Sequence, residues 1–378
     1  MIRKCCISST YILTLVHFLL SFISFAQTDT SRVSFTFIGD VMGHDTQIRS
    51  AYQKQTNDFD YNSVFQYLKP QMSAADFTIA NLEVTLGIKP YKGYPSFSSP
   101  AALASGLQNA GVDALVTANN HSCDRGKSGI ITTLDILDNL EIQHTGTFRN
   151  SNEKEESPLL ILEKDGIRVA LLNYTYGTNG IPVPSPTIVN LIDKTKIEED
   201  IIRAKKSYVD KIILFVHWGL EYQSNPSKEQ QSLYQYCIEK GADIIIGSHP
   251  HVLQRIEKHD NRFVAYSLGN FVSNQRKRYT DGGTLLHFEI AKLGDKSWVE
   301  NPNYQLTWVY TPNEKGRKEF YVLPASKYEQ EYDFFVGMQD YEAMMLFLND
   351  TRKLYDAQNI NVPEKYYNSK TKAWEVRK

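Results

Sequence analysis

Seven residues that can bind metal ions or transfer protons follow short apolar runs of this chain. Each run is rich in β-branched or aromatic residues and gives way to an acid, an amide or a histidine. The seven residues are Asp40, Glu83, Asn120, His121, His217, His249 and His251. In an open α/β sheet, side chains from separate strands converge where the strands give way to loops. We therefore expect these residues to form one site.

The types of these side chains suit a pair of metal ions. Asp40 and Glu83 offer carboxylates, Asn120 offers an amide oxygen, and the three later histidines offer imidazoles. Two divalent ions about 3.5–4 Å apart activate a bound water and lower its pKa toward ~7. Ligands of these types, without thiolate, suit zinc, manganese or iron. The predicted cofactor is therefore two divalent ions, whose charge exceeds that of the two carboxylates and attracts an anionic substrate group.

The elements that must position these residues alternate between strand and helix patterns. Seven β-rich runs are predicted as strands, at residues 33–38, 77–80, 114–117, 169–172, 211–216, 243–246 and 263–266. Because most of these runs are almost wholly apolar, the strands are expected to be buried. Ser99-Pro100 predicts the start of one helix, and Ser227 with Gln230 forms a capping box that opens another, ending at Gly241. The spacing within residues 130–140 and 197–208 predicts two amphipathic helices, and the whole pattern indicates an α/β fold.

The chain is expected to have three parts. Arg3 and Lys4 precede an uncharged, apolar stretch, which predicts an export signal over residues 1–26. The alternative is an uncleaved N-terminal membrane anchor, since such a run is long enough to span a bilayer. Residues 32–325 are predicted to form the main domain, and residues 326–378 a C-terminal helical extension whose helix runs from Tyr332 to about Gln358. The working part is expected outside the cytoplasm, in the periplasm or at the cell surface.

Charge and cysteine content exclude some classes of function. Without Arg3 and Lys4, 39 of the 41 basic residues remain against 43 acidic ones, so the chain offers no electrostatic footprint for nucleic acid. Only Cys123 and Cys237 lie beyond the predicted signal, which leaves a single bridge open but excludes a disulfide framework.

The motifs around the seven residues resemble those of the capsule-synthesis CapA/PgsA family, in order and spacing over residues 33–290. They are Gly39-Asp40-Val41-Met42, Asn81-Leu82-Glu83, Ala118-Asn119-Asn120-His121, His217-Trp218-Gly219-Leu220-Glu221-Tyr222, Gly247-Ser248-His249-Pro250-His251 and Ser267-Leu268-Gly269-Asn270-Phe271. The resemblance implies the fold of calcineurin-like metallophosphoesterases, in which packed mixed sheets are flanked by helices. It also implies a link with capsule and poly-γ-glutamate synthesis or anchoring.

The resemblance further implies a role for each residue of the site. Asp40 matches the first aspartate ligand, Glu83 takes the bridging position, and Asn120 and the later histidines match the remaining ligands. His121 matches the histidine that contacts the leaving group. Two departures stand out: His44 follows four residues after Asp40 in place of an Asp-x-His opening, and Ser122 replaces the usual acid after the motif histidine. The first departure leaves open a metal with one ligand fewer, or a single ion.

Other residues near the motifs have a functional and a structural interpretation. Trp218, Glu221 and Tyr222 follow His217 and are candidates for a substrate cleft, with packing as the alternative for the two aromatic rings. Asn270 is a fourth substrate-site candidate, which either orients a histidine or supplies turn geometry. Asp124 is expected to cap the following helix rather than take part in catalysis. Cys123 is expected to be an inert thiol.

The leading hypothesis is a metal-dependent hydrolase or transferase that acts on an anionic cell-envelope polymer or its precursor. In this hypothesis metal-bound hydroxide is the nucleophile and His121 protonates the leaving group. The alternative is a non-catalytic accessory protein that binds or exports capsule polymer. Poly-γ-glutamate contains no phosphate, so the fold analogy and the capsule link point to different bonds. The expected partners are the anionic polymer and membrane-bound capsule synthesis proteins.

The export signal gives a first testable prediction. Ser24 and Ala26 flank Phe25 in the small-x-small pattern that a signal peptidase accepts, so the exported protein is expected to begin at Gln27. Mass spectrometry of the exported protein measures this terminus. Recovery of a chain that keeps Met1 in the membrane fraction would establish the anchor instead.

Overall fold

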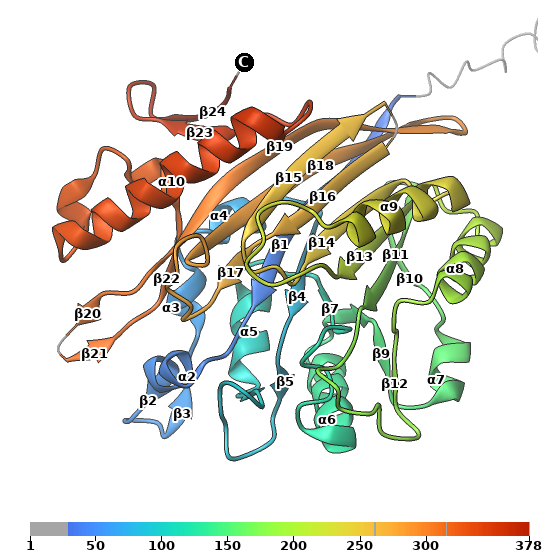
Figure 1. Cartoon of the computed structure of the whole chain (residues 1–378), viewed down its shortest axis with the longest axis horizontal. Coiled ribbons are helices and arrows are strands. Elements are labelled where there is room, and N and C mark those ends of the chain that lie inside the picture. Colours follow the sequence, from blue (N-terminus) through green and yellow to red (C-terminus); the bar gives the residue numbers. More distant parts are fainter. Residues whose placement is uncertain (1–28, 261, 315, 378) are drawn as a thin grey trace, which may run out of the picture.

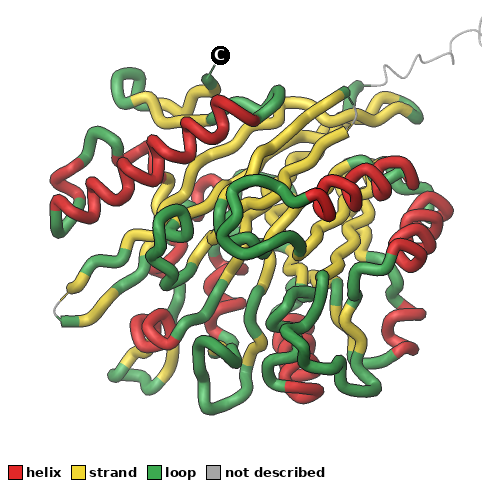
Figure 2. Tube along the Cα trace, viewed as in Figure 1, coloured by secondary structure: helices red, strands yellow, loops and turns green. Residues whose placement is uncertain are grey.

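Two mixed β-sheets packed face to face form the centre of the fold, and helices cover their outer faces (Figure 1). The structure is a computed structural model that describes residues 29–260, 262–314 and 316–377. Figure 2 shows the strands gathered in the middle and the helices around them. The predicted architecture of packed mixed sheets flanked by helices is therefore confirmed.

The first sheet has a parallel half and an antiparallel half that share strand β1. The parallel half consists of β1 (Ser31–Val41), β4 (Phe77–Leu82), β7 (Ala114–Val116) and β8 (Gln143–Thr145). The antiparallel half consists of β18 (Gly282–Leu293), β19 (Lys296–Tyr310) and β22 (Tyr321–Pro324). A short strand, β17 (Asn270–Val272), pairs in parallel with the end of β1.

The second sheet is parallel at its centre and antiparallel at both edges. Its strands, in spatial order, are β10 (Leu160–Lys164), β11 (Ile167–Thr175), β13 (Lys211–His217), β14 (Ile244–Ser248), β16 (Arg262–Leu268) and β15 (Leu253–His259). All seven predicted strands are present, because each predicted run lies within or largely overlaps one of β1, β4, β7, β11, β13, β14 and β16.

Aromatic rings hold the two sheets together. Phe37 of the first sheet is 0% exposed. Its ring centroid lies 5.7 Å from that of Phe288 in the same sheet and 6.0 Å from that of Phe215 in the second sheet. Phe263, also from the second sheet, packs edge-to-face on Phe288 at 5.3 Å. Large rings that interdigitate across a sheet interface fix the distance and the angle between the sheets.

The outer face of each sheet has its own helical layer. Helices α3 (Asn62–Phe65), α4 (Lys69–Met72) and α5 (Ala102–Asn109) pack on the first sheet. Helices α8 (Lys194–Lys206) and α9 (Lys228–Lys240) pack on the second. Helix α6 (Gly126–Asn139) follows β7. The predicted capping box of α9 is present, with Gln230 N–H donating to Ser227 Oγ at 3.2 Å.

Some local predictions were wrong. Helix α5 has Ala101 as its N-cap, two residues after the predicted Ser99. Ile202 and Tyr208, both within the predicted helix of residues 197–208, are 43% and 87% exposed. Tyr208 lies beyond the end of α8 at Lys206, and the buried face of α8 consists of residues that recur at helical spacing: Ile197, Asp200, Ile201 and Ala204.

The C-terminal segment packs on the same core as the sheets. Helix α10 (Met338–Gln358) begins six residues after the predicted start at Tyr332 and contributes Met344, Phe347 and Tyr355 to the core. A hairpin, β23 (Lys365–Asn368) and β24 (Ala373–Val376), follows it. The predicted signal, residues 1–26, lies outside the described residues. Among the described helices, none is long and apolar enough to cross a membrane.

The aromatic contact between the sheets predicts a large loss of stability on truncation. Phe37→Ala is expected to lower the free energy of unfolding by about 3–5 kcal/mol, because it opens a cavity between the sheets. Chemical denaturation with fluorescence detection measures the change. Tyr332→Ala, at a side chain that is 55% exposed, is the matched control and is expected to change stability by less than about 0.5 kcal/mol. Equal effects of the two variants would contradict this description of the core.

Candidate metal centre

The predicted ligands come together where the parallel strands of both sheets end. Asp40 lies near the end of β1, Glu83 follows β4 and Asn120 follows β7. From the second sheet, His217 ends β13, and His249 and His251 follow β14. All six side chains are buried. The convergence that strand-end placement predicted is therefore present in the structure.

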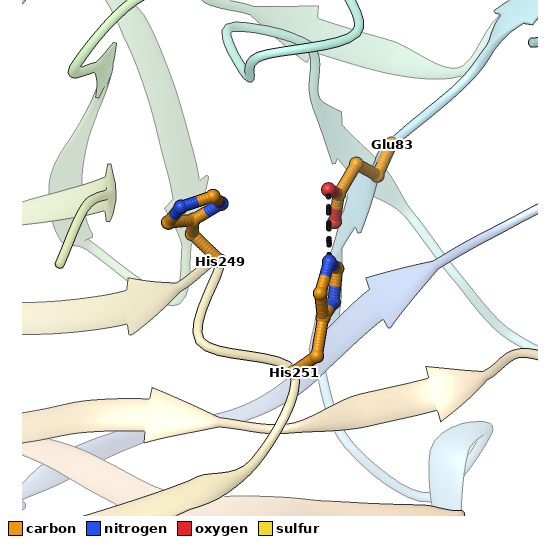
Figure 3. A group of neighbouring side chains, drawn as sticks. All are labelled: Glu83, His249 and His251. Atoms are coloured by element: carbon orange, nitrogen blue, oxygen red, sulfur yellow. Dashed lines mark ion pairs between the residues drawn. The ribbon is translucent and has the colours of Figure 1, made fainter. Parts of the chain in front are cut away.

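Glu83 occupies the middle of this group. Its Oε1 atom lies 3.6 Å from His217 Nε2 and 3.7 Å from His251 Nε2. Figure 3 shows the Glu83 carboxylate facing the ring of His251, with His249 on the same loop as His251. Among the described residues, no hydrogen bond satisfies Glu83 Oε1. One carboxylate oxygen thus lies between two imidazole nitrogens.

The other ligands surround Glu83. Asn120 Oδ1 is 3.0 Å from His217 Nε2, and the ring centroids of His217 and His249 are 4.8 Å apart. Asp40 Oδ2 is 3.1 Å from His251 Nδ1. Two sets of three residues could each hold a metal ion, because within each set one ligand atom per residue lies within 4.8 Å of the others. The first set is Asp40, Glu83 and His217, and the second is Glu83, His249 and His251, so Glu83 belongs to both.

The electrostatics of the group fit divalent cations. Burial and the nearby Asp40 carboxyl raise the pKa of Glu83 well above its usual range. Burial and the neighbouring histidines lower the pKa of His217 well below its usual range and that of His249 to about 3. These two imidazoles are therefore neutral, which is the form that binds metal. Among the described residues, no Lys or Arg pairs with Asp40 or Glu83, and His249 Nδ1 has no hydrogen-bond partner.

The loop after β14 holds its two histidines in an uncommon backbone conformation. His249 has φ 97° and His251 has φ 56°, both in the left-handed region. Strained conformations of this kind cost roughly 1–3 kcal/mol and persist where the surrounding structure enforces them. Tyr222 N–H donates to Pro250 O at 2.8 Å and fastens the middle of the loop. This strained turn directs two imidazoles from one short segment into the site.

Buried amides and a hydroxyl orient the ligands. Asn81 Nδ2 donates to Asp40 Oδ1 at 2.8 Å, and Asn119 Nδ2 donates to Asn81 Oδ1 at 3.3 Å. Ser248 Oγ lies 2.9 Å from His217 Nδ1. We did not predict these three residues as part of the site, although all of them stand inside the quoted motifs. Their position in those motifs, one or two residues from a ligand, was the available signal.

The four substrate-site candidates lie in different environments. Asn270 is buried with its Oδ1 atom 3.0 Å from His251 Nδ1, a contact that orients the histidine. Trp218 is 2% exposed, and its indole N–H donates to Tyr266 O, so its contacts are those of a packed core residue. Glu221 and Tyr222 are exposed, and the Tyr222 ring lies 6.2 Å from that of His251. The last two therefore lie at the rim of the site.

His121 is held by a carboxylate that we assigned wrongly from the sequence. Asp124 Oδ2 lies 2.8 Å from His121 Nδ1 and accepts the Phe97 N–H at 2.6 Å. Asp124 does not cap α6, whose N-cap is Arg125 without a side-chain bond. The edge-to-face contact of Phe97 with His121, at 4.6 Å, fixes the ring further. His121 belongs to neither of the two ligand sets.

Two nearby residues have structural surroundings. His44 Nδ1 lies 3.0 Å from Gln47 Oε1 within the N-terminal cap of a short helix, α2 (Asp45–Ala51), and His44 is in neither ligand set. Cys123 is 1% exposed, and burial raises the pKa of its thiol to about 11. Both Cys123 and Cys237 are free thiols. The prediction that Cys123 is inert agrees with these surroundings.

The loop after β11 adds a tyrosine to the site. Tyr176 is 47% exposed, and its ring centroid lies 4.6 Å from that of His249 and 6.3 Å from that of His217. It also lines a cavity of about 680 Å³ together with Leu220 and Lys228. We did not predict Tyr176 as part of the site, because the sequence shows no periodicity in this loop.

Fold and site together define an α/β protein with a candidate metal centre at its strand ends. The chain belongs to a family of bacterial capsule proteins, because residues 34–275 match the family described as "Bacterial capsule synthesis protein PGA_cap". "PGA biosynthesis protein CapA" of Bacillus subtilis is 30% identical over 71% of this chain and 71% of its own length. "Capsule biosynthesis protein CapA" of Bacillus anthracis is 26% identical over 70% of this chain and 66% of its own length. The chain thus spans about two thirds of these relatives.

Solved structures with a similar fold are more distant. The NAD nucleotidase of Haemophilus influenzae is 12% identical, with a TM-score of 0.45 over 90% of this chain and 58% of its own. The calcineurin-like phosphoesterase YfkN of Bacillus subtilis is 14% identical, with a TM-score of 0.42 over 73% of this chain and 90% of its own. At this distance they add nothing to the chemistry of the site, which follows from the residues of this chain.

The ligand histidines and His121 are expected to respond differently to substitution. His249→Ala and His251→Ala are each expected to lower the metal content of the purified protein, because each removes one imidazole from a ligand set. His121→Ala is expected to keep the metal, since His121 lies outside both sets. Elemental analysis after dialysis against a weak chelator measures the content. Loss of metal from His121→Ala with retention in His251→Ala would reverse the assignment.

Proposed function

We propose that this chain is a metal-dependent hydrolase or transferase of the capsule-synthesis family, which acts outside the cytoplasm on an anionic cell-envelope polymer or its precursor. The observation that carries the proposal is the hydrogen-bonded pair of His121 and Asp124 beside the ligand sets. A site that only bound metal for stability would have no use for a buried histidine held by a carboxylate. A positioned acid or base, by contrast, is what a bond-breaking step needs.

The residues around the site would have different roles in such a reaction. When bound, divalent ions supply Lewis-acid activation of a water molecule and of an anionic substrate group. The carboxylate of Asp124 accepts the proton on His121 Nδ1, so Nε2 is the nitrogen that exchanges a proton with the leaving group. Asn270 and Ser248 hold the rings of His251 and His217 in place. Tyr176 and Tyr222, both partly exposed beside ligand histidines, border the space for the substrate.

The substrate class rests on the family and on the charge of the site. The printed names of the two Bacillus relatives concern capsule and PGA biosynthesis, which supports a capsule polymer or its precursor as the substrate here. The ligand sets contain two carboxyls, so two divalent ions would leave the centre positive and favour an anionic group. Membrane-bound capsule synthesis proteins are the proposed partners. A non-catalytic accessory role is the alternative, and the His121–Asp124 pair argues against it.

Substitution of the acid separates catalysis from binding. His121→Ala is expected to slow turnover by ~10²–10⁴-fold with unchanged metal content, because a general acid contributes about that factor. The loss should shrink for a substrate with a good leaving group, which needs no protonation. Rates on a nitrophenyl phosphodiester and on a γ-glutamyl anilide measure both effects and identify the bond that is cleaved. Metal-loaded protein without activity on any substrate would support the accessory role.

A positioning role for Asp124 has its own control. Asp124→Asn is expected to lower kcat and to shift the pH profile, because a neutral amide does not stabilise a protonated His121 ring as a carboxylate does, and its NH₂ group can donate to Nδ1 and select the other tautomer. Asp138→Asn is the matched variant, since Asp138 Oδ1 contacts His144 Nε2 at 2.9 Å in a second His–Asp pair at the surface. The control is expected to leave kcat and the pH profile unchanged. Equal effects of the two variants would remove Asp124 from the mechanism.

A further inference from the structure

A groove with a basic lining lies along helix α2, the short helix that follows Asp40 in the sequence. Its cavity has a volume of about 770 Å³. It is bordered by α2 and by two hairpins, β2–β3 (Tyr52–Gln53 and Asp58–Phe59) and β20–β21 (Asn313–Glu314 and Arg317–Lys318). Helix α2 contacts β21, and Figure 1 shows these elements together at the lower left. The four cations that line it, Arg49, Lys54, Arg317 and Lys318, define what we call the basic groove.

Most of this positive charge is not neutralised by the surrounding described residues. Arg49 Nη2 donates to Thr46 Oγ1 at 3.0 Å, and Lys318 Nζ donates to Asn274 Oδ1 at 2.8 Å, so both have neutral partners. Arg317 pairs with Glu319, which also accepts a hydrogen bond from Ser50. The lining itself contains no acidic residue. Four cations therefore gather on a chain whose net charge is −2.

An aromatic wall gives the basic groove a firm apolar side. The ring centroids of Tyr52 and Phe59 are 5.4 Å apart, and Phe59 meets Tyr91 edge-to-face at 5.3 Å. All three rings line the cavity. Interlocked rings of this kind are rigid, and they offer contact area to the methylene groups of a ligand. The groove therefore combines cations for acidic groups with an apolar surface for the chain that carries them.

The basic groove extends along helix α2 from the side of Asp40. Asn274, the neutral partner of Lys318, donates its N–H at 3.4 Å to Nδ1 of His44, the N-cap residue of α2, which follows Asp40 by four residues. Helix α2 has seven residues, which corresponds to about 10 Å at 1.5 Å per residue. Nearer the centre, Lys277 Nζ lies 5.2 Å from the centroid of the Tyr222 ring, beside His251. Cations thus extend from the rim of the site to the far end of α2.

We propose that the basic groove binds a linear polyanion, holding the part of the chain that lies several units away from the reacting bond. The groove is a binding site separate from the metal ligands, and its link to the metal centre rests on the proposed function. The acidic groups are carboxylates or phosphates, which share this electrostatic recognition. An extended chain advances about 3.3–3.6 Å per residue-sized unit, so three or more units are needed to pass α2. Affinity therefore depends on the length of the chain as well as on its charge.

Charge reversal tests the basic groove without touching the metal centre. The variant Arg49→Glu/Lys54→Glu changes two exposed side chains of the groove. The matched control, Lys196→Glu/Lys206→Glu, makes the same change of net charge on exposed positions of α8, at the right of Figure 1. The probe is a fluorescein-labelled polyglutamate of about twenty units, with single glutamate as the length control. Inorganic polyphosphate of similar length competes, which distinguishes phosphate from carboxylate as the preferred group.

The groove variant is expected to bind the labelled polymer at least about tenfold more weakly than the wild type at low salt, and to lose most of the salt dependence of binding. The control should bind like the wild type, and single glutamate should not compete. Both variants should keep their metal content and their rate on a small substrate. Equal affinities of the groove variant and the wild type, or an equal loss in the control, would overturn the inference, as would a wild type that binds neither polymer.

The outcomes for the basic groove and for the proposed function are separable. If polymer binding is lost only in the groove variant and the wild type has no hydrolytic activity, the result supports polymer binding by the basic groove and contradicts the proposed enzymatic function. If the wild type hydrolyses a small substrate and the groove variant binds the polymer as well as the wild type does, the result supports the enzymatic function and overturns polymer binding by the basic groove. Stronger competition by polyphosphate than by unlabelled polyglutamate assigns the acidic groups of the ligand as phosphates.

Discussion

The contact between one buried carboxylate of the first sheet and two imidazoles of the second is the constraint on which the site depends. Glu83 follows a strand of the first sheet, whereas His217 and His251 come from the second. Contacts of 3.6 and 3.7 Å form only if the sheets pack at one distance and in one register. The rings of Phe37 and Phe215, packed between the sheets, set that distance. The geometry of the site is therefore a consequence of the core.

This arrangement buries charged and polar groups, which costs free energy of folding. A buried carboxylate without a partner costs several kcal/mol, and each unpaired polar atom about 1–3 kcal/mol. The site limits the cost with amides, because Asn81 donates to Asp40 and Asn119 donates to Asn81. Glu83 Oε1 and His249 Nδ1 stay without a hydrogen bond among the described residues. Divalent cations held by Glu83 and His249 would offset part of this cost, so metal binding would stabilise the fold through residues of the same site.

What could be predicted from the sequence was local. The strands were predictable because their apolar runs are continuous, and the ligands because each follows its strand directly. The partner of His121 was not predictable, since Asp124 lies at a helix start, where capping is the usual role of an aspartate. Tyr176 was missed because its contact with His249 depends on how an irregular loop folds back. The basic groove joins residues near position 50 with residues near 317, and no local pattern reports such a contact.

The candidate metal centre and the basic groove lie differently with respect to the family match. The family match covers residues 34–275 and contains every predicted ligand. Arg317 and Lys318, which complete the basic groove, lie beyond it. Strand ends are fixed by the core, whereas hairpins at the surface tolerate insertion and change of charge. All residues of the candidate metal centre therefore lie within the family match, whereas the proposed polymer groove also depends on two residues outside it.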